Sequence, residues 1–268
     1  MRSHHHQAHV LAITNMRGGC AKTTNALHIG LASARMGNRV LMVDLDPQAH
    51  LTASLAVEGD FLQFVDDALS GKHAKPTQTK TENVCILPSR IGLSSLLESG
   101  IFSKVRWEEM LLKALDPVIT EFDLVVIDTP ATFSKLHTIA LRASDAYVIS
   151  LRPEAFSVVG YDESRSQVEA FKEECGISKP IFLGYILSGV PKAKRRAVDR
   201  IREGLGAELN GRSIEIPLDV AFDEARWSDG STNRSIFDWA GTEELQAAYL
   251  EACGKLTKWM NDADGVRT

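Results

Sequence analysis

The sequence lacks the features that mark a secreted or membrane-spanning protein. No apolar run approaches the roughly 20 residues that a helix needs to cross a bilayer, and the N-terminus has no apolar signal-peptide core. The chain also has no C-x-x-C pair and no cysteine spacing that would indicate a disulfide framework. We therefore expect a cytoplasmic protein with free thiols. The cysteines are Cys20, Cys85, Cys175 and Cys253.

An excess of positive charge is missing as well. The formal net charge is −5 and the pI is about 5.9, so the chain is not a protein that coats nucleic acid with its whole surface, and any DNA contact must come from a local patch. With 268 residues, 44% hydrophobic and 24% charged, we expect one large soluble domain and no second one. Residues 1–9 are interpreted as a flexible leader or as residues introduced by cloning, and not as a metal site, although they contain His4, His5, His6 and His9.

The stretch Asn15–Thr24, NMRGGCAKTT, predicts a binding site for phosphate. The apolar run Val10–Ile13 precedes it and a helical pattern of apolar residues follows, which predicts a strand, a glycine turn and a helix N-terminus. Paired glycines let the backbone approach a ligand, and the first N–H groups and the dipole of a helix favour an anion. Lys22 adds a full positive charge, and Thr23 adds a hydroxyl that can ligate Mg²⁺.

The common phosphate-loop pattern G-x-x-x-x-G-K-[ST] is not met, because Met16 and Ala21 occupy its glycine positions. The stretch instead resembles the deviant Walker A box, K-G-G-x-G-K-[ST]-T, of the ParA/MinD family of P-loop ATPases. Arg17 stands where that family has its signature lysine, and Ala21 replaces a glycine. The alternative is a glycine turn before an ordinary α/β helix, which is disfavoured because four further segments agree with the family.

Two aspartates follow the next predicted strand, Arg39–Val43, in the segment Asp44–Gln48, DLDPQ. Ligands bind at the carboxyl ends of parallel strands, so both carboxylates are expected in the same crevice as Lys22. The segment resembles the family's second nucleotide motif, which implies that Asp46 orients the attacking water and contacts the Mg²⁺ shell while Asp44 supports the site. The alternative is that these strand-end aspartates cap a helix, and both roles can coexist.

A further strand, Leu124–Ile127, ends in an acid, Asp128, and is followed by Thr129 and Pro130. Four apolar residues before an acid are typical of a Walker B strand, and the distance downstream of the phosphate loop strengthens this interpretation. Mg²⁺ keeps several of its waters and prefers carboxylate and phosphate oxygens, so Asp128 is expected to hold it through a water. The predicted metal site consists of Thr23, Asp46 and Asp128.

Strands and helices alternate along the rest of the chain, which predicts a parallel sheet covered on both faces. We expect an α/β fold in a single domain, residues 10–261, with a doubly wound, mostly parallel sheet flanked by helices, followed by a frayed tail at 262–268. Residues 53–120 are less informative and are assigned to scaffold and partner contacts. Further expected helices are 61–69, 93–97, 107–115 and 157–175, and further strands are 84–87, 144–149 and 181–187.

The resemblance also assigns residues to the nucleotide. Ser188 is expected to touch the adenine, and Pro217 to line the base, because 214–220 with Glu224 and Ala225 resembles the family's I-P-x-x-V…E-A segment. The phosphate loop supplies the other contacts to ATP, together with Asp46. These loop residues are Arg17, Gly18, Gly19, Cys20, Ala21, Lys22, Thr23 and Thr24.

The segment Pro191–Arg202 carries six basic residues against a single acid in a chain that is acidic overall. One interpretation is a solvated helix face near the nucleotide. The other is non-specific contact with DNA phosphates, which weakens steeply as salt rises. Family members that bind DNA do so as ATP-bound dimers with scattered basic residues. The candidate DNA contacts are Lys192, Lys194, Arg195, Arg196, Arg200 and Arg202.

The resemblance implies hydrolysis of ATP, with Mg²⁺, between two subunits. Lys22 and the loop amides hold the phosphates, Asp46 orients water, and Arg17 is expected to reach across the dimer interface as the family's lysine does. Arginine offers a bidentate fork but is longer and planar, so the replacement need not be neutral. Ala21 adds a methyl where the backbone needs a glycine-like conformation, which predicts slow turnover.

The implied function is a partition ATPase on the nucleoid that segregates plasmid or chromosomal DNA with an adaptor protein of ParB type. The alternatives are a related ATPase that positions a protein cargo on the nucleoid, and a slowly hydrolysing, nucleotide-locked dimer that serves as a scaffold. A MinD-like membrane role is not expected, because the chain end Trp259–Gly265 is short and acidic. An iron–sulfur carrier would commonly have C-x-x-C, and a tyrosine-kinase relative a C-terminal tyrosine cluster, and neither pattern is present.

Overall fold

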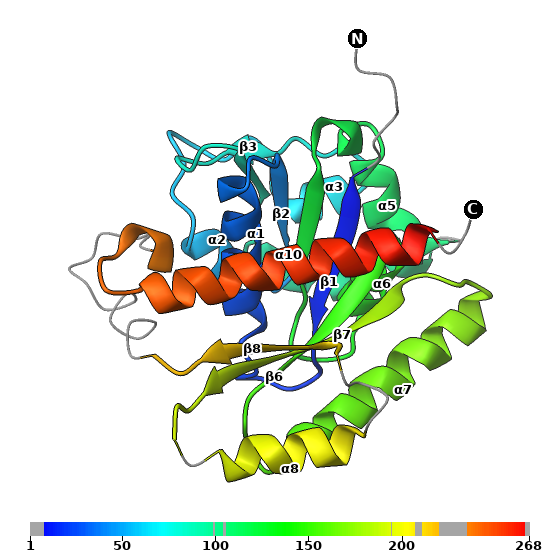
Figure 1. The fold of residues 1–268 in the computed structure, drawn as a ribbon. Coiled ribbons are helices and arrows are strands. Elements are labelled where there is room, and N and C mark those ends of the chain that lie inside the picture. Colours follow the sequence, from blue (N-terminus) through cyan, green and yellow to red (C-terminus); the bar gives the residue numbers. More distant parts are fainter. Residues whose placement is uncertain are drawn as a thin grey trace.

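A sheet of eight strands runs through the middle of the molecule in the computed structural model (Figure 1). The structure describes residues 8–98, 100–103, 106–193, 195–206, 211–219 and 235–265. The strand order is β3-β4-β2-β5-β1-β6-β7-β8, and each neighbouring pair is parallel except β3 with β4. The strands are β1 (His9–Thr14), β2 (Val40–Asp44), β3 (Thr77–Gln78), β4 (Val84–Leu87), β5 (Leu124–Asp128), β6 (Ala146–Leu151), β7 (Ile181–Val190) and β8 (Ser213–Pro217).

The central strands form because their apolar residues are covered on both sides. Every residue of β2, β5 and β6 is buried, which is the pattern of a parallel sheet between two layers of helices. β1 occupies the middle of the sheet, between β5 and β6. The chain therefore winds outward from β1 in both directions, which confirms the predicted doubly wound α/β fold.

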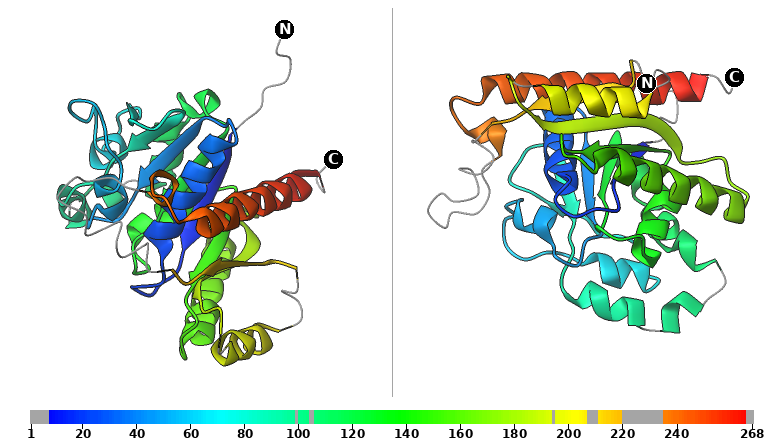
Figure 2. Two further views of the ribbon diagram at one scale, coloured as in Figure 1. Left: turned by 60° about the vertical axis from the view of Figure 1, so that its left-hand side comes forward. Right: turned by 90° about the horizontal axis from the view of Figure 1, so that it is seen from below.

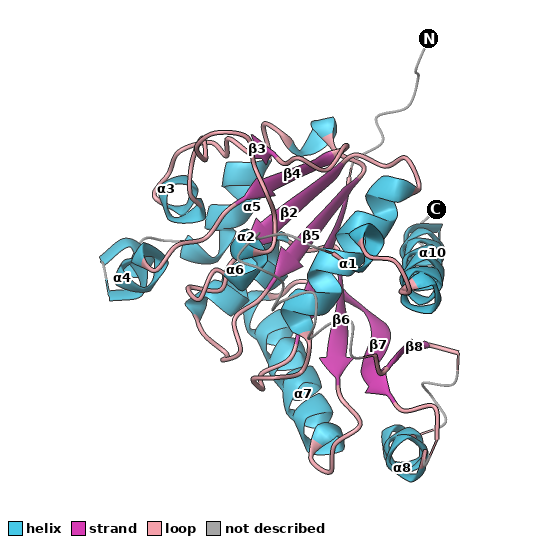
Figure 3. Ribbon diagram, turned by 90° about the vertical axis from the view of Figure 1, so that its left-hand side faces the viewer, coloured by secondary structure: helices cyan, strands magenta, loops and turns pink. Residues whose placement is uncertain are grey.

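Helices cover both faces of the sheet (Figure 3). One face is covered by α1 (Lys22–Arg35) and by the C-terminal helix α10 (Glu243–Gly265). The other face has two groups of helices, one over β2 and β5 and one over β6 and β7. The first group contains α3 (Val65–Leu69), α5 (Met110–Leu115) and α6 (Lys135–Ala143), and the second contains α7 (Ser157–Cys175) and α8 (Arg196–Leu205). Two short helices, α2 (His50–Ala53) and α4 (Gly92–Glu98), complete the α-helices that the structure describes.

The C-terminal helix α10 lies against α1 and crosses the sheet (Figure 2). Its buried face contains Leu245, Tyr249 and Ala252, as the helical spacing of these residues predicts. The helix continues to Gly265, so the start of the segment 262–268 is helical rather than frayed, and residues 266–268 lie outside the described ranges. α10 therefore brings the end of the chain back to the first βα unit.

Several other boundaries differ from the sequence prediction, and two of these differences have a local cause. The helix expected at 61–69 begins only at Val65, because Phe64 is extended and the backbone N–H of Leu62 donates to Thr77 Oγ1 at 2.8 Å. The strand expected at 181–187 continues to Val190, because its pairing with β8 extends that far. Among the described residues, no helix has the length and apolar character to cross a membrane.

Candidate functional site

The carboxyl ends of the central strands bring the three predicted motifs to one edge of the sheet. Asp44 ends β2 and Asp128 ends β5, and these two residues are partners in the strand register. Ile13, near the end of β1, is the partner of Asp128 on its other side. Because the phosphate loop leaves β1 at this edge, its residues lie beside both carboxylates.

The phosphate loop turns into α1 through two residues in the left-handed region. Gly19 has φ 76°, and Ala21 has φ 63° and ψ 24°. Ala21 is the N-cap of α1 and supplies no side-chain hydrogen bond, so the first N–H groups of the helix have no side-chain cap from it. A left-handed conformation costs a residue with a Cβ about 1 kcal/mol or more. The glycine-like backbone expected at Ala21 is confirmed.

Lys22, the first residue of α1, lies back across the loop. Its Nζ donates to the carbonyl oxygen of Arg17 at 3.0 Å, and the residue is buried. Burial lowers the pKa of Lys22, while the nearby carboxylates of Asp128 and Asp46 oppose this shift. The ammonium group is therefore largely removed from water and faces the acidic end of the site, which is an arrangement that an added phosphate would stabilise.

Asp44 organises the turn after β2. Its carboxylate accepts hydrogen bonds from the Thr52 N–H at 2.8 Å, the Thr52 hydroxyl at 2.7 Å and the Asp46 N–H at 3.0 Å. Burial raises the pKa of Asp44 to about 6, although these hydrogen bonds oppose the shift. Asp46 is half-buried and accepts from the Gln48 N–H at 2.9 Å. Asp44 thus has the structural contacts of a turn and helix cap, and it holds Asp46 at the cavity.

Asp128 has the opposite environment, because it is fully buried and its carboxylate is not satisfied. Neither oxygen has a hydrogen-bond partner within the part of the chain that the structure describes. Burial raises the pKa of Asp128 well above its usual range, and the charge of Asp44 adds to this effect, while Thr23 and Lys22 oppose it. A buried carboxylate without a partner is costly, so the site is suited to a cation that compensates it.

The residues present fit Mg²⁺ held together with phosphate. The buried carboxylate of Asp128, the hydroxyl of Thr23 and the carboxylate of Asp46 are oxygen donors of the kind that Mg²⁺ prefers. Among the described residues, no group of three or more His, Cys, Asp or Glu side chains could hold a metal ion by itself. Oxygens from a bound phosphate and water must therefore complete the coordination shell.

A cavity of about 440 Å³ opens at this edge of the sheet. Its lining includes Lys22 and Thr23 of the phosphate loop, Asp46 after β2, and Ser188 of β7. Pro217 is not among the described lining residues, because it pairs with Val190 at the end of β8, and the next two residues line the cavity instead. Among the described residues, the lining consists of Gly18, Gly19, Cys20, Ala21, Lys22, Thr23, Thr24, Asp46, Gln48, His50, Ala131, Arg152, Ser188, Gly189, Leu218, Asp219 and Tyr249.

The sequence prediction missed several lining residues, among them His50, Arg152 and Tyr249. Arg152 carries the signal that identified Asp46, because it directly follows a buried strand at the same edge of the sheet. Tyr249 carries no local signal, since it comes from α10, more than 200 residues away from the loop.

A buried hydrogen-bond network beneath the loop centres on Asn25 of α1. Its amide nitrogen donates to Ser150 Oγ at 2.8 Å and to Ser188 Oγ at 2.9 Å, and its amide oxygen accepts from the Tyr249 hydroxyl at 2.8 Å. Ser150 in turn donates to the carbonyl of Cys20. The network ties the phosphate loop to β6, β7 and α10, so the loop is held by three elements that are distant in sequence.

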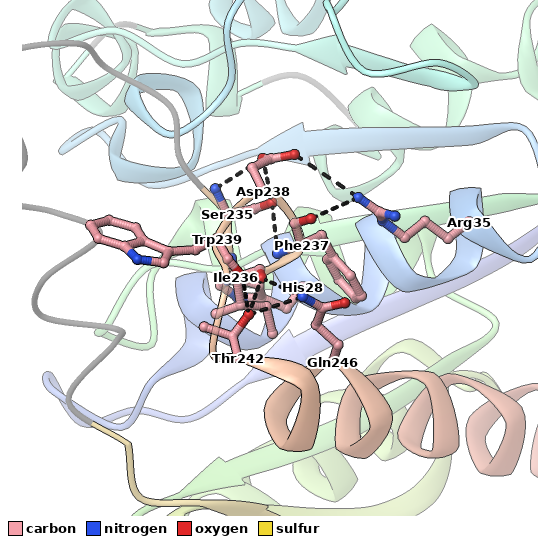
Figure 4. A network of polar contacts seen from close by, with 9 residues as sticks. All are labelled: His28, Arg35, Ser235, Ile236, Phe237, Asp238, Trp239, Thr242 and Gln246. Atoms are coloured by element: carbon pink, nitrogen blue, oxygen red, sulfur yellow. Dashed lines mark hydrogen bonds and ion pairs between the residues drawn. The ribbon is translucent and has the colours of Figure 1, made fainter.

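A second network joins α1 to the turn before α10 (Figure 4). In that turn the N–H of Ile236 points to His28 Nε2 at 3.4 Å, and Arg35 donates to the carbonyl of Phe237 at 2.9 Å. Ser235 caps the turn, and Gln246 of α10 donates to the carbonyl of Ile236 at 2.9 Å. These contacts fix the start of α10 against α1 and thereby position Tyr249.

Arg17 lies outside the described lining of the cavity. Its Nη1 donates to the carbonyl of Phe156 at 2.8 Å, and its guanidinium carbon is 5.4 Å from the Phe156 ring centroid. A Cβ on Gly160 would be 2.7 Å from Arg17 Cδ, so the glycine leaves room for the side chain along α7. Arg17 and Phe156 are exposed on the outer surface beside the loop.

The basic segment divides into paired and unpaired residues. Lys192 pairs with Glu244 at 2.5 Å, and Arg195 and Arg202 both pair with Glu215. Arg196 and Arg200, one turn apart on α8, are exposed and have no ion pair with any described residue. Lys194 lies outside the described residues, as do Glu224 and Ala225.

Comparison of the sequence with known proteins identifies relatives of this chain. Residues 8–180 match the model of a family described as an AAA domain. The chain is 35% identical over 160 residues to the sporulation initiation inhibitor protein Soj of Bacillus subtilis, covering 58% of this chain and 62% of Soj. It is 34% identical over 160 residues to the virulence plasmid ParA family protein pGP5-D of Chlamydia psittaci, covering 56% of this chain and 59% of that protein. The chain spans less than two thirds of the length of these relatives.

Similarity to solved structures extends over nearly the whole chain. The crystal structure described as cobyrinic acid a,c-diamide synthase from Mycobacterium smegmatis, with bound ADP and magnesium, has a TM-score of 0.74 and 25% sequence identity. The match covers 94% of each chain.

Proposed function

Because the chain belongs to the ParA/MinD-type P-loop ATPases, within the family described as an AAA domain, we propose that it is a partition or positioning ATPase that binds Mg-ATP and hydrolyses it. The observation that carries the proposal is the buried, unsatisfied carboxylate of Asp128 beside Lys22 and Thr23 at the phosphate loop. This combination provides a cation site and a phosphate site at the same edge of the sheet. The structural relative with bound ADP and magnesium supports the same ligands.

Each residue of the site has a role in phosphoryl transfer that follows from its position. Lys22 and the loop amides would hold the β- and γ-phosphates, Thr23 would supply a hydroxyl ligand to Mg²⁺, and Asp128 would hold the hydrated ion. Mg²⁺, when bound, neutralises the charge that develops on the transferred group. Asp46, held at the cavity by Asp44, orients the attacking water. The other loop residues, Gly18, Gly19, Cys20, Ala21 and Thr24, complete the nucleotide contacts within the cavity, and Ser188 contacts the base.

We further propose that Arg17 acts across a homodimer interface. Its side chain lies along its own α7 and outside its own cavity, which supports a role towards the nucleotide of a second subunit. The exposed Phe156, with 65% of its surface accessible, provides apolar area beside it for such an interface. An arginine that reaches a partner's phosphates increases phosphoryl-transfer rates by about 10³ to 10⁵ in other systems.

Non-specific DNA contact, in this proposal, is centred on Arg196 and Arg200. Both are exposed and lack an ion pair with any described residue, so they are available to phosphates, whereas Arg195, Arg202 and Lys192 are paired with glutamates. The cycling protein would associate with the nucleoid and with an adaptor of ParB type. An adaptor gene or a protein-assembly gene beside this one would distinguish DNA cargo from protein cargo.

The test of the proposed reaction is phosphate release with Mg-ATP. Asp46→Ala is expected to bind ATP but to lose most of its turnover, because the water is no longer oriented. Asp60→Ala, which removes an exposed aspartate outside the cavity, is the matched control and should keep full turnover. Wild-type turnover in Asp46→Ala would contradict the assigned mechanism.

A nucleotide-locked scaffold is the second candidate, and the left-handed conformation of Ala21 favours it. A methyl group in this strained position can hold the loop in a geometry that binds nucleotide better than it hydrolyses it. An ATP-dependent dimer in size-exclusion chromatography, with phosphate release no higher than that of Lys22→Ala even when DNA is added, would support the scaffold and contradict the cycling ATPase.

A further inference from the structure

The cavity has a second cation that the phosphate-binding motifs do not include. The loop residues, Lys22 and Asp46 define its phosphate end, so the remaining space, which is lined by Ser188, Gly189 and Leu218, is left for the nucleoside. Arg152 lines this cavity as well. Its position therefore decides whether it serves the phosphates or the base.

The strand register places Arg152 beside Ser188. Leu151, the last residue of β6, pairs with Leu187 of β7, so Arg152 follows beside Ser188 at the carboxyl edge of the sheet. Lys22 lies on α1 and faces Asp128 at the phosphate end of the site. The two cations thus come from different elements, and Arg152 is the one that contacts the space above Gly189.

Arg152 and Leu218 converge over the backbone of Gly189. A Cβ on Gly189 would lie 3.6 Å from Nη2 and 3.8 Å from Nε of Arg152, and 3.7 Å from Cδ1 of Leu218. Gly189 has φ 78°, a conformation that favours glycine, and its missing side chain leaves the space above it to the two neighbours. The guanidinium group and the leucine methyl groups therefore form one continuous wall.

This wall is available to a ligand. Arg152 has a long ion pair with Glu154, with 3.9 Å between Nε and Oε1, and both side chains are substantially exposed, so the pair holds it weakly. Leu218 lines the cavity and has 53% of its surface accessible. A planar cation beside an apolar side chain is a surface that suits the face of an aromatic ring.

Resting on the proposed nucleotide binding, we propose that Arg152 and Leu218 form the wall against which the base stacks, with the guanidinium plane over the ring. Arg152 is then a specificity-determining residue that favours the larger ring of a purine over that of a pyrimidine. It contributes affinity through the base and not through the phosphates, which Lys22 and the loop amides serve.

The test compares Arg152→Lys, which keeps the charge but removes the plane, with the wild type in calorimetric titrations of Mg-ATP, Mg-CTP and Mg-tripolyphosphate. We expect the affinity for ATP to fall about 3- to 30-fold, the range that a cation–π contact supplies. The affinity for tripolyphosphate should stay the same, and the preference for ATP over CTP should narrow. Leu218→Ala should weaken ATP binding in the same selective way.

Arg39→Lys is the matched control, because Arg39 has a similar exposure and an ion pair with Asp123 but precedes β2 at the opposite edge of the sheet. It should leave all three affinities unchanged. Equal losses for ATP and tripolyphosphate in Arg152→Lys would assign the residue to the phosphates and overturn the proposal, as would an unchanged affinity for ATP. If the wild type binds ATP without hydrolysing it, only the proposed reaction is wrong. If the wild type binds no ATP, the proposed reaction and the proposed role of Arg152 are both wrong.

Discussion

Asp44 and Asp128 are partners across the β2–β5 register, yet only Asp44 has its carboxylate satisfied. Asp44 accepts three hydrogen bonds from Thr52 and Asp46, and Asp128 accepts none from any described residue. Burial raises the pKa of each carboxyl group, and the charge of Asp44 raises the pKa of Asp128 further. The two neighbouring carboxylates therefore destabilise the folded protein at neutral pH when no ligand is bound, and a bound cation removes this destabilisation.

Asp128→Asn should stabilise the protein in the absence of ligand. A carboxyl whose pKa is higher in the folded than in the unfolded state destabilises the fold above its unfolded pKa, and this effect disappears as the pH falls. We expect a gain of about 1–3 kcal/mol in the free energy of unfolding at pH 8, and no gain near pH 4. Urea unfolding at both pH values measures this difference.

The same variant should lose the stabilisation that Mg-ATP gives to the wild type, because the cation no longer has a charge to neutralise. Melting temperatures with ATP in the presence of Mg²⁺ or EDTA provide the comparison. A variant that is less stable than the wild type at pH 8, or that responds fully to Mg²⁺, would show that Asp128 does not carry an uncompensated charge.

Ala21→Gly should relieve the left-handed backbone of the phosphate loop. We expect the free energy of unfolding to rise by up to about 1 kcal/mol, because relief of the strain exceeds the extra chain entropy of glycine. ATP turnover should rise as well, because Ala21 no longer holds the phosphate loop in a strained geometry. Ala49→Gly is the control, since Ala49 is also an N-cap with positive φ, 54°, but belongs to α2. A gain in turnover for Ala49→Gly equal to that for Ala21→Gly would argue against a specific effect of the loop.

Replacing Arg196 and Arg200 by Glu should weaken ATP-dependent DNA binding and reduce its salt dependence. Each lost phosphate contact lowers the slope of log K against log salt by about 0.9. Fluorescence anisotropy over a salt series measures the slope. The control is Lys72 and Lys113 replaced by Glu, which has the same change in charge but lies on α5 and beside α3, under the other half of the sheet. Equal effects of the two double variants would point to net charge rather than to the α8 face.

The buried His137 should lower the free energy of unfolding in mild acid. Its Nε2 is 2.7 Å from Thr14 Oγ1, and burial, with the nearby Lys22, lowers its pKa to about 4. Between the unfolded pKa of about 6.5 and this value the unfolded chain binds a proton that the folded protein does not, so stability falls as the pH falls, by up to roughly 3 kcal/mol. His137→Gln should remove this part of the pH dependence. Urea unfolding of both proteins between pH 7 and pH 4 tests it, and parallel curves would contradict it.

The sequence alone predicted the parts of the site that depend on local residue patterns and on the topology of parallel sheets. An apolar run, a glycine turn and a helical pattern predict the βα unit around Lys22, and Asp44, Asp46 and Asp128 are identified because they follow buried strands. The rule that such strand ends meet at one edge is sufficient to bring these residues together. The family resemblance was visible in the same short segments.

Only the tertiary structure decided how these residues differ, because their partners are distant in the chain. Thr52 satisfies Asp44, while Asp128 is left without a partner among the described residues. Glu215 pairs with two arginines of the basic segment and leaves Arg196 and Arg200 available. Tyr249 and Arg152 reach the cavity from α10 and from the end of β6. Sequence pattern determines which backbone elements form, but the charge and hydrogen-bonding state of a buried group depends on what packs against it, and packing is decided by the whole fold.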